Sequence, residues 1–229
     1  EYAGHATELA KQAIADGVKK IVVLGGDGTI REVACAVMNT DVQLGIISCG
    51  TGNDIIRPLQ IPKDPLAALE IILSGEARHM YAAMANDLLF FNVAGFGFDV
   101  DLLRYVEIYK KRMKNGSLAY LRGLLTALLH LNSRKTKISW PGGSMEADVL
   151  IIAAGNGTHF GGGMKVTPNA DPFDGLLDIC IINNVSKLNA YMILPKFMKG
   201  EHLKTKYVTY FKTTELTAVC EPASLLDVD

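Results

Sequence analysis

Two glycine loops, each containing an acidic residue, constrain the fold of this chain more than any other feature. The first loop covers residues 25–29 (GGDGT) and follows an apolar run at residues 21–24; the second covers residues 50–54 (GTGND) and follows residues 44–47. Each apolar run predicts a buried strand. Glycines let backbone N–H groups approach phosphates closely. The pattern therefore predicts an α/β unit that binds a phosphate chain beside a carboxylate.

The two loops do not match the commoner phosphate-binding motifs. A Walker loop requires GxxxxGK[ST], which the chain does not contain. The dinucleotide motif GxGxxG lacks its third glycine in both loops, because Arg31 and Ile55 stand at that position. Either loop alone could be an ordinary turn between a strand and a helix. Two loops in matching contexts favour a shared phosphate-binding role.

The first third of the chain alternates between predicted strands and predicted helices. We expect strands at residues 21–24 and 44–47, helices at residues 7–16, 29–38 and 65–74, and a short helical segment at residues 53–59. Such alternation is typical of a parallel sheet with helices on its faces.

From about residue 78 the pattern changes to short apolar runs separated by turn residues. Strands are expected at residues 80–85, 88–93, 136–140, 148–154, 177–182, 207–211 and 215–220, with helices at residues 100–114, 117–132 and 187–199. The pattern favours an antiparallel β domain. The predicted fold class is α/β, with a nucleotide-binding α/β domain at residues 1–78 and a mainly antiparallel, β-sandwich-like domain at residues 79–229. Each domain is expected to be incomplete at its outer end.

Composition excludes several classes of protein. The formal net charge is −1, which argues against a nucleic-acid partner held by bulk electrostatics. Four cysteines lack C-x-x-C spacing, so neither zinc nor a disulfide framework is expected, and a reducing cytoplasmic setting fits. The longest apolar stretch, residues 118–131, is too short for a transmembrane segment and contains Arg122 and His130.

Five motifs, in order along the chain, resemble those of the bacterial diacylglycerol kinases and related lipid kinases. Besides the two loops and Glu32, they are residues 92–99 (NVAGFGFD), a block from Gly155 to Asp178 with GN, GGG, PNA and DGLLD elements, and residues 226–229 (LDVD). GGDGT alone also occurs in NAD kinases and phosphofructokinases. The five together are specific and span nearly the whole chain. The resemblance implies an active site in the cleft between the two domains.

The resemblance implies ATP- and Mg²⁺-dependent phosphorylation of a lipid hydroxyl, most of all conversion of diacylglycerol to phosphatidic acid. Asp27 is the expected catalytic residue, since phosphoryl transfer needs positioning and charge neutralisation. Alternatively, the Asp27 side chain could serve only to stabilise the turn, and Glu32 could equally cap its own helix. Where the family has Asn, this chain has Arg31. The expected nucleotide-binding residues are Gly25, Gly26, Asp27, Gly28, Thr29, Ile30, Arg31 and Thr51.

An acidic run in the last glycine-containing block is a candidate metal site. Asp171, Asp174 and Asp178 surround a tight turn, and spaced oxygen ligands suit Mg²⁺. The resemblance implies a structural Mg²⁺ held by the Asp174 carboxylate and by the backbone carbonyls of Asp171 and Leu176. The alternative is a solvated acidic turn.

A basic segment next to an apolar one is a candidate membrane contact. Residues 104–114 carry five cations and precede the apolar residues 118–131, a combination that suits an anionic bilayer. The alternative is a solvated face beside a buried helix. The resemblance implies a cytoplasmic protein, peripheral at the inner membrane surface, that meets its lipid substrate there. A homodimer is left open.

Two other functions remain open at this stage. An NAD-kinase-like enzyme shares the GGDG motif, and a non-catalytic nucleotide- or lipid-binding protein would also need the glycine loops. The family's terminal motif continues with Gly-Glu, and the resemblance implies that this Glu is the general base. We therefore expect the base just beyond Asp229, and the 229-residue chain by itself to be nearly inactive.

Overall fold

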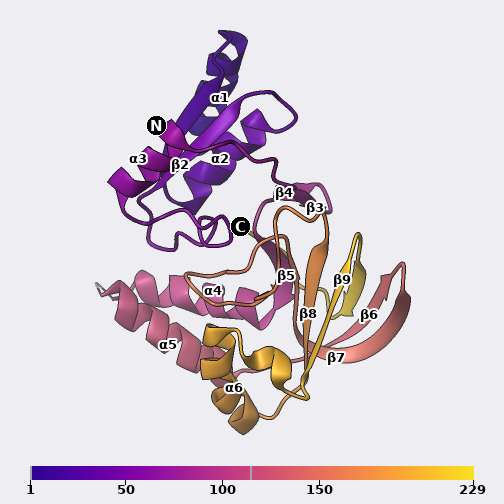
Figure 1. Ribbon diagram of the computed structural model, residues 1–229. Coiled ribbons are helices and arrows are strands. Elements are labelled where there is room, and N and C mark those ends of the chain that lie inside the picture. The colour runs from indigo at the N-terminus through magenta and orange to yellow at the C-terminus, as the bar shows by residue number, and fades with distance from the viewer. Residues whose placement is uncertain (1, 114) are drawn as a thin grey trace.

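The protein folds into two units that meet near the C-terminal end of the chain (Figure 1). The computed structural model describes residues 2–113 and 115–229, and the side chains of residues 99 and 117 fall outside the description. The first unit consists of α1 (His5–Ala15), β1 (Lys20–Gly25), α2 (Asp27–Val37), β2 (Gln43–Ser48) and α3 (Pro65–Ser74). Strands β1 and β2 pair in parallel, as the alternating sequence pattern predicts.

The second unit is a mainly antiparallel sheet with three helices on one side (Figure 1). Its strands are β3 (Ala83–Ala85), β4 (Leu88–Phe90), β5 (Val93–Gly97), β6 (Arg134–Trp140), β7 (Gly143–Gly155), β8 (Leu177–Asn183), β9 (Val208–Thr213), β10 (Thr217–Glu221) and β11 (Asp227–Val228). Its helices are α4 (Phe98–Lys110), α5 (Gly116–Leu129) and α6 (Lys187–Lys199), followed by a 3₁₀ turn at His202–Lys204. The predicted fold class is confirmed.

The long strand β7 separates the two cores of the second unit. Successive side chains of a strand point to opposite faces, so Ile151 packs under helices α4 and α6 whereas Ile152 packs on the other side of the sheet with Ile179 and Ile181. β7 pairs with β5, β6 and β8, which makes it the central strand. Strand β5, which leads directly into α4, is therefore fixed by its hydrogen bonds to the central strand β7.

The short helix expected at residues 53–59 does not form. Residues 55–60 form turns instead, closed by hydrogen bonds such as Ile61 N to Ile56 O at 3.0 Å. Pro58 has no N–H to donate and disfavours a helical residue before it. Asn53 and Gln60 also have left-handed φ values of 52° and 56°. The helical prediction for this segment is wrong for these reasons.

The strand expected at residues 88–93 is interrupted. β4 ends at Phe90 and β5 starts at Val93, because the N–H groups of Phe91, Asn92 and Val93 all donate to the Asp229 carboxylate. The segment between the strands thus binds the end of the chain rather than a neighbouring strand. The N-x-x-G-x-G stretch that follows forms β5, whereas the side chain of Asp99 lies outside the described residues.

Glu32 caps a helix other than its own. Its two carboxylate oxygens accept hydrogen bonds from Gly4 N (2.9 Å) and Ala6 N (3.2 Å), at the start of α1. Thr7 Oγ1 in turn donates to the Glu32 carbonyl. A carboxylate is favourable at the positive end of a helix. Glu32 therefore joins α1 to α2, and its expected role at the start of α2 finds no support in the geometry.

Candidate active site

The two glycine loops lie against each other at the end of the parallel sheet. Cys49 N donates to the Gly25 carbonyl at 2.9 Å. A Cβ atom on Gly50 would stand 2.5 Å from Gly26 Cα, and a Cβ on Gly25 would stand 2.7 Å from Thr29 Cβ. Real Cβ atoms do not approach other atoms so closely. The glycines are therefore required for the loops to pack, independently of any ligand.

Asp27 belongs to the first loop, and its side chain lies against the second loop. It opens α2, and its Oδ1 accepts a hydrogen bond from Ile55 N at 3.1 Å. Its Oδ2 is 2.9 Å from the place where a Cβ on Gly52 would be. Asp27 is half-buried, so one carboxylate oxygen is fixed and the other lies beside the second loop. This arrangement holds a negative charge at a defined position next to the loops.

The start of α2 offers free backbone donors. No side chain of the described residues caps this helix, and Ile30 N, bonded to Gly26 O at 3.0 Å, makes its first helical hydrogen bond. The N–H groups of Asp27, Gly28 and Thr29 therefore point out of the helix at its positive end. A Cβ on Gly28 would meet nothing within 4 Å. The start of α2 thus has both the open space and the free N–H donors that an anion needs.

The other predicted nucleotide-binding residues differ in which of their atoms could reach a nucleotide. The side chains of Thr29 and Thr51 are exposed at the loops, where hydroxyls can reach a phosphate. Ile30 is 1% exposed and belongs to the core of the first unit, so only its backbone can contribute. Arg31 reaches across the junction, where its Nη2 donates to the Leu89 carbonyl at 2.9 Å.

Asp54 connects the second glycine loop to the second unit. Its Oδ2 accepts a hydrogen bond from Gly162 N at 2.6 Å, and its Oδ1 lies 3.2 Å from Arg57 Nε. Burial raises the pKa of Asp54, the nearby Asp27 carboxylate raises it further, and the Gly162 N–H and Arg57 oppose the shift. Two carboxylates, those of Asp27 and Asp54, thus lie beside Gly52 of the second loop. Sequence analysis did not predict Arg57, which belongs to no recognisable motif.

The turn containing Gly162 is itself held by two asparagines. Asn156 Nδ2 donates to the carbonyls of Tyr81 and Phe91, both at 2.9 Å, and Asn92 Nδ2 donates to the His159 carbonyl. Both asparagines are almost fully buried. They fix the glycine-rich segment against the junction between the units. The motif pattern pointed to this segment, but it gave no indication of these partners.

His159 stands in the same segment as a neutral imidazole. Burial, together with the nearby cations Arg57 and Lys165, lowers its pKa to about 4. Its Nδ1 lies 2.7 Å from Thr158 Oγ1. The imidazole therefore stays uncharged at neutral pH, and it adds no positive charge next to Arg57.

Asp229 is a half-buried carboxylate that binds the segment between β4 and β5. Its Oδ1 accepts from Asn92 N (3.1 Å) and Val93 N (2.9 Å), and its Oδ2 accepts from Phe91 N (2.8 Å). Burial raises the pKa of Asp229, while these three N–H groups and the charge of Arg31 lower it. The terminal L-D-x-D motif thus holds the segment between β4 and β5 within the second unit, near Arg31 of the first unit.

The acidic turn holds a lysine where the resemblance implies a metal ion. Asp174 Oδ2 lies 2.5 Å from Lys212 Nζ, and its Oδ1 accepts from Leu176 N at 2.9 Å. Asp171 Oδ1 accepts from Phe173 N. Among the residues that the structure describes, no group of three His, Cys, Asp or Glu could hold a metal ion. The oxygens have the right chemistry for Mg²⁺, but an ion fits here only if Lys212 moves.

The acidic turn is coupled to the junction through Tyr81. Tyr81 N donates to the Pro172 carbonyl at 2.9 Å, and a Cβ on Gly175 would lie 3.2 Å from the Tyr81 ring. The carbonyl of Tyr81 accepts from Asn156. The acidic turn thus holds Tyr81 in place. Tyr81 in turn binds Asn156, at the start of the segment that carries Gly162.

An α/β unit with paired glycine loops and an adjoining antiparallel unit define a nucleotide-dependent phosphotransferase of the kind found in lipid kinases. The sequence profile of the "diacylglycerol kinase catalytic domain" matches residues 1–85, and that of the "YegS C-terminal NAD kinase beta sandwich-like domain" matches residues 92–227. The chain belongs to this diacylglycerol kinase family of lipid kinases.

Individual relatives agree with this assignment. The chain is 31% identical over 222 residues to a diacylglycerol kinase of Mycobacterium tuberculosis, covering 94% of this chain and 71% of the relative. It is 29% identical over 230 residues to a diacylglycerol kinase of Bacillus subtilis, with coverages of 99% and 76%. A crystal structure of a diacylglycerol kinase from Bacillus anthracis shares the fold, with a TM-score of 0.74 and 23% identity over 100% of this chain and 75% of that one.

Proposed function

We propose that the protein transfers the γ-phosphoryl group of ATP to a lipid hydroxyl, with diacylglycerol as the acceptor and phosphatidic acid as the product. The observation that carries this proposal is the position of Asp27 between two packed glycine loops in a chain of this family. The hypothesis of an NAD-kinase-like enzyme has less support, because the relatives named above are diacylglycerol kinases.

In the proposed mechanism the start of α2 binds the ATP phosphates. The N–H groups of Asp27, Gly28 and Thr29 donate to phosphate oxygens, and the Thr29 and Thr51 hydroxyls add further donors. Gly25, Gly26 and the Ile30 backbone shape this turn, and Arg31 adds a cation near it. Mg²⁺ bound with ATP supplies neutralisation of the phosphate charge. Positioning and such neutralisation are what phosphoryl transfer mainly needs.

Asp27 orients the acceptor in this mechanism. One oxygen is held by Ile55 N, so the other can accept a hydrogen bond from the lipid hydroxyl and align it with the phosphoryl group. Asp54, held by Gly162 N and Arg57, keeps the two units closed around the substrates. Asp171, Asp174 and Leu176 remain the proposed structural metal site, conditional on movement of Lys212.

Helix α5 is the proposed membrane contact. Leu118, Leu121, Leu125 and Leu129 follow one helical face and are 50%, 50%, 45% and 57% exposed. The end of α4 adds exposed Lys110, Lys111 and Arg112 nearby, whereas Lys114 lies outside the described residues. An exposed leucine stripe beside cations suits the surface of an anionic bilayer.

No helix in the described part of the chain is long and apolar enough to cross a membrane. We propose that the protein works in the cytoplasm as a peripheral protein at the inner membrane surface, where α5 meets the bilayer. Light scattering of the purified protein distinguishes a monomer from a homodimer.

A radiolabelled-ATP assay tests the proposed function. The purified full-length protein is incubated with vesicles that contain diacylglycerol, phosphatidylglycerol or sphingosine, and separately with NAD. Mg²⁺-dependent labelling of diacylglycerol is expected. Labelling of NAD alone would identify an NAD kinase. ATP binding by calorimetry without transfer to any acceptor would identify a non-catalytic nucleotide-binding protein.

A further inference from the structure

The mechanism proposed above uses Arg57 only as a partner of Asp54. The Arg57 Nε lies 3.2 Å from Asp54 Oδ1, and its Nη2 lies 3.5 Å from the Gly52 carbonyl oxygen. A guanidinium has five N–H donors, so these contacts with described residues leave donors free, above all those of Nη1. The side chain is 29% exposed. A ligand beside the second glycine loop can therefore reach the guanidinium.

Gly52 contacts both Arg57 and Asp27. Its carbonyl faces Arg57 Nη2, and a Cβ on Gly52 would stand 2.9 Å from Asp27 Oδ2. Asp27 Oδ2 is the oxygen that the proposed mechanism assigns to the acceptor hydroxyl, because Oδ1 is held by Ile55 N. The guanidinium and the reacting hydroxyl thus lie next to the same residue, which has no side chain to separate them.

The glycine hairpin of the second unit leaves open space beside Arg57. A Cβ on Gly163 would stand 3.3 Å from Arg57 Nη2, whereas a Cβ on Gly162 would meet nothing within 4 Å. The φ values of Gly162 and Gly163 are 86° and 116°, which residues with a side chain disfavour. The hairpin therefore approaches the guanidinium closely without filling the space next to it, and an anion has room there.

The backbone of Arg57 is fixed on both sides. Ile55 and Ile56 precede it and are 3% and 1% exposed in the core of the first unit. Pro58 follows it and lies against the second unit, where a Cβ on Gly157 would stand 3.1 Å from Pro58 Cγ. An arginine held in this way by its backbone and its Nε loses little conformational freedom when it binds a ligand.

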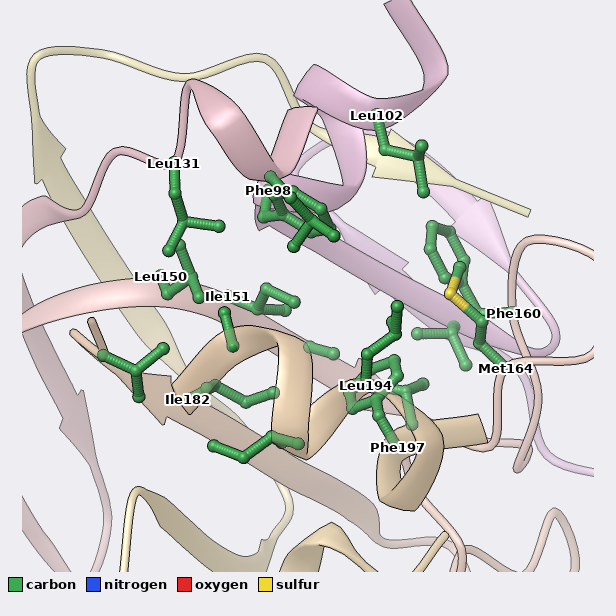
Figure 2. A pocket seen from close by; sticks show the side chains of 17 residues that line it. Phe98, Leu102, Leu131, Leu150, Ile151, Phe160, Met164, Ile182, Leu194 and Phe197 are labelled. Atoms are coloured by element: carbon green, nitrogen blue, oxygen red, sulfur yellow. The ribbon is translucent and has the colours of Figure 1, made fainter. Parts of the chain in front are cut away.

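The hairpin that faces Arg57 is anchored in the core of the second unit. Phe160 and Met164 form its base, with backbone hydrogen bonds of 2.9 and 3.0 Å between them. Both side chains pack into the apolar cluster under α4 and α6, where Figure 2 shows them next to each other. Gly162, at the tip, donates to Asp54. The position of the hairpin relative to Arg57 is therefore set by core packing and by this hydrogen bond.

The charges around the glycine loops require a cation at this place. In phosphoryl transfer the oxygens of the moving group carry negative charge, and the two carboxylates of the loops add to it. Arg31 donates to the Leu89 carbonyl, and the aliphatic part of Lys165 packs against Gly200. Arg57, by contrast, faces the open space beside the loops. Its planar pair of N–H donors also matches the oxygens of a phosphoryl group.

We propose that the Arg57 guanidinium binds the γ-phosphoryl group while this group passes from ATP to the lipid hydroxyl. The proposal rests on the proposed lipid kinase function and adds a residue to its mechanism. In that step the hydroxyl oxygen forms a bond to the γ-phosphorus, the bond from this phosphorus to the β,γ-bridging oxygen breaks, and ADP leaves. The hydroxyl proton passes to a carboxylate general base. Arg57 forms no covalent bond, and its N–H groups donate to the peripheral oxygens of the moving group.

Substitutions of Arg57 in the full-length protein test this role. Arg57→Lys keeps a positive charge for Asp54 but loses the planar donors, so kcat should fall at least tenfold while the melting temperature stays close to that of the parent. Arg57→Gln should lower kcat at least 100-fold, and KM for ATP should change less than threefold in both variants. Arg134→Gln, which removes an arginine from an ion pair with Asp101, is the matched control and should leave kcat unchanged. A kcat within threefold of the parent for Arg57→Gln would overturn the proposal.

A mimic of the moving phosphoryl group separates this role from a purely structural one, and it also covers the case in which Arg57→Gln fails to fold. Aluminium fluoride with ADP and Mg²⁺ imitates the group in transfer, and fluorine NMR detects the bound fluoride. With dihexanoylglycerol present, aluminium fluoride should tighten ADP binding by the parent at least tenfold. Arg57→Lys should lose this gain and keep its affinity for ADP alone. If Arg57→Lys keeps the gain, or loses affinity for ADP alone to the same extent, Arg57 does not bind the phosphoryl group.

The same measurements distinguish failure of this proposal from failure of the proposed function. If the parent protein phosphorylates no lipid, the kinase function is wrong and the role of Arg57 falls with it. If the parent phosphorylates a lipid, and the Arg57 variants keep both kcat and the gain from aluminium fluoride, the function stands and the role of Arg57 is wrong.

Discussion

The backbone N–H of Gly162 donates to the Asp54 carboxylate at 2.6 Å, which joins a hairpin of the second unit to a glycine loop of the first. Asp54 is only 7% exposed, so loss of this bond would leave a buried carboxylate with fewer partners. The same hairpin carries Phe160 and Met164 at its base. The second glycine loop and the hairpin of the second unit are thus linked through one pair of residues.

The first prediction concerns Asp27. Asp27→Asn keeps an oxygen that can accept from Ile55 N but removes the charge, so the fold should be retained. If Asp27 orients the acceptor hydroxyl, kcat should fall by roughly 10²-fold, the loss that misplacing a reacting group by about 1 Å can cause. Affinity for ATP should change little. Kinase assays with calorimetry and circular dichroism measure both effects. Asp41→Asn, an exposed aspartate after α2, is the control, and parental activity of Asp27→Asn would remove Asp27 from the mechanism.

The second prediction contrasts two glycines of the loops. A Cβ on Gly50 would stand 2.5 Å from Gly26 Cα, so Gly50→Ala should force the loops apart and lower both the melting temperature and the affinity for ATP. A Cβ on Gly28 meets open space within helix α2, where alanine is favoured over glycine by about 1 kcal/mol. Gly28→Ala should therefore raise or preserve the melting temperature.

The two glycine variants also test where the phosphate lies. If the phosphate packs against Gly28, Gly28→Ala should weaken ATP binding at least fivefold despite its retained stability. Thermal unfolding with and without ATP measures both quantities. Tight ATP binding by Gly28→Ala would place the phosphate elsewhere, and unchanged stability of Gly50→Ala would contradict the packing of the two loops.

The sequence predicted the glycine loops correctly because their signal is local. A short apolar run, glycines and an acid define a strand, a turn and the start of a helix within ten residues, and β1, Asp27 and α2 follow that pattern. Helix α3, bounded by Pro65 and Gly75, matches its prediction at both ends for the same reason.

Contacts between distant parts of the chain could not be predicted in the same way. Asp229 binds the N–H groups of residues 91–93 across more than 130 positions, and nothing in either segment indicates the other. Glu32 was expected to cap its own helix, but it caps the start of α1 instead. Such features depend on how the units pack.

A third prediction concerns pH and His159. Burial and the cations Arg57 and Lys165 lower the pKa of His159 to about 4 from 6.5. The unfolded chain therefore binds the proton first as pH falls, so the contribution to stability is complete above pH 6.5 and is lost as the pH decreases toward 4. NMR titration of the imidazole should give a midpoint near 4.

A variant isolates this contribution. His159→Gln should flatten the dependence of the unfolding free energy on pH between 4 and 6.5, as measured by urea denaturation. His79→Gln, at an exposed histidine, should leave that dependence unchanged. A His159 midpoint near 6.5 would mean that the ring is solvated and does not face Arg57.

The last prediction concerns the cation at the acidic turn. Lys212 Nζ lies 2.5 Å from Asp174 Oδ2 and 3.4 Å from Asp178 Oδ2, and the Asp178 side chain is fully buried. The lysine thus neutralises the Asp174 carboxylate that a divalent ion would use, and the two cations compete for one place. Lys212→Gln should lower the melting temperature in EDTA, because it leaves Asp174 and Asp178 without a counter-charge.

Mg²⁺ should then restore the thermal stability that Lys212→Gln removes. An ion that binds only the folded state stabilises it by mass action, so the melting temperature of Lys212→Gln should rise with Mg²⁺, with half-saturation at least tenfold lower than in the parent. Lys137→Gln removes a lysine from an exposed pair with Glu146 and is the control. Adding Asp174→Asn to Lys212→Gln should abolish the response. A parent that responds to Mg²⁺ as strongly as Lys212→Gln would show that Lys212 does not compete with the ion.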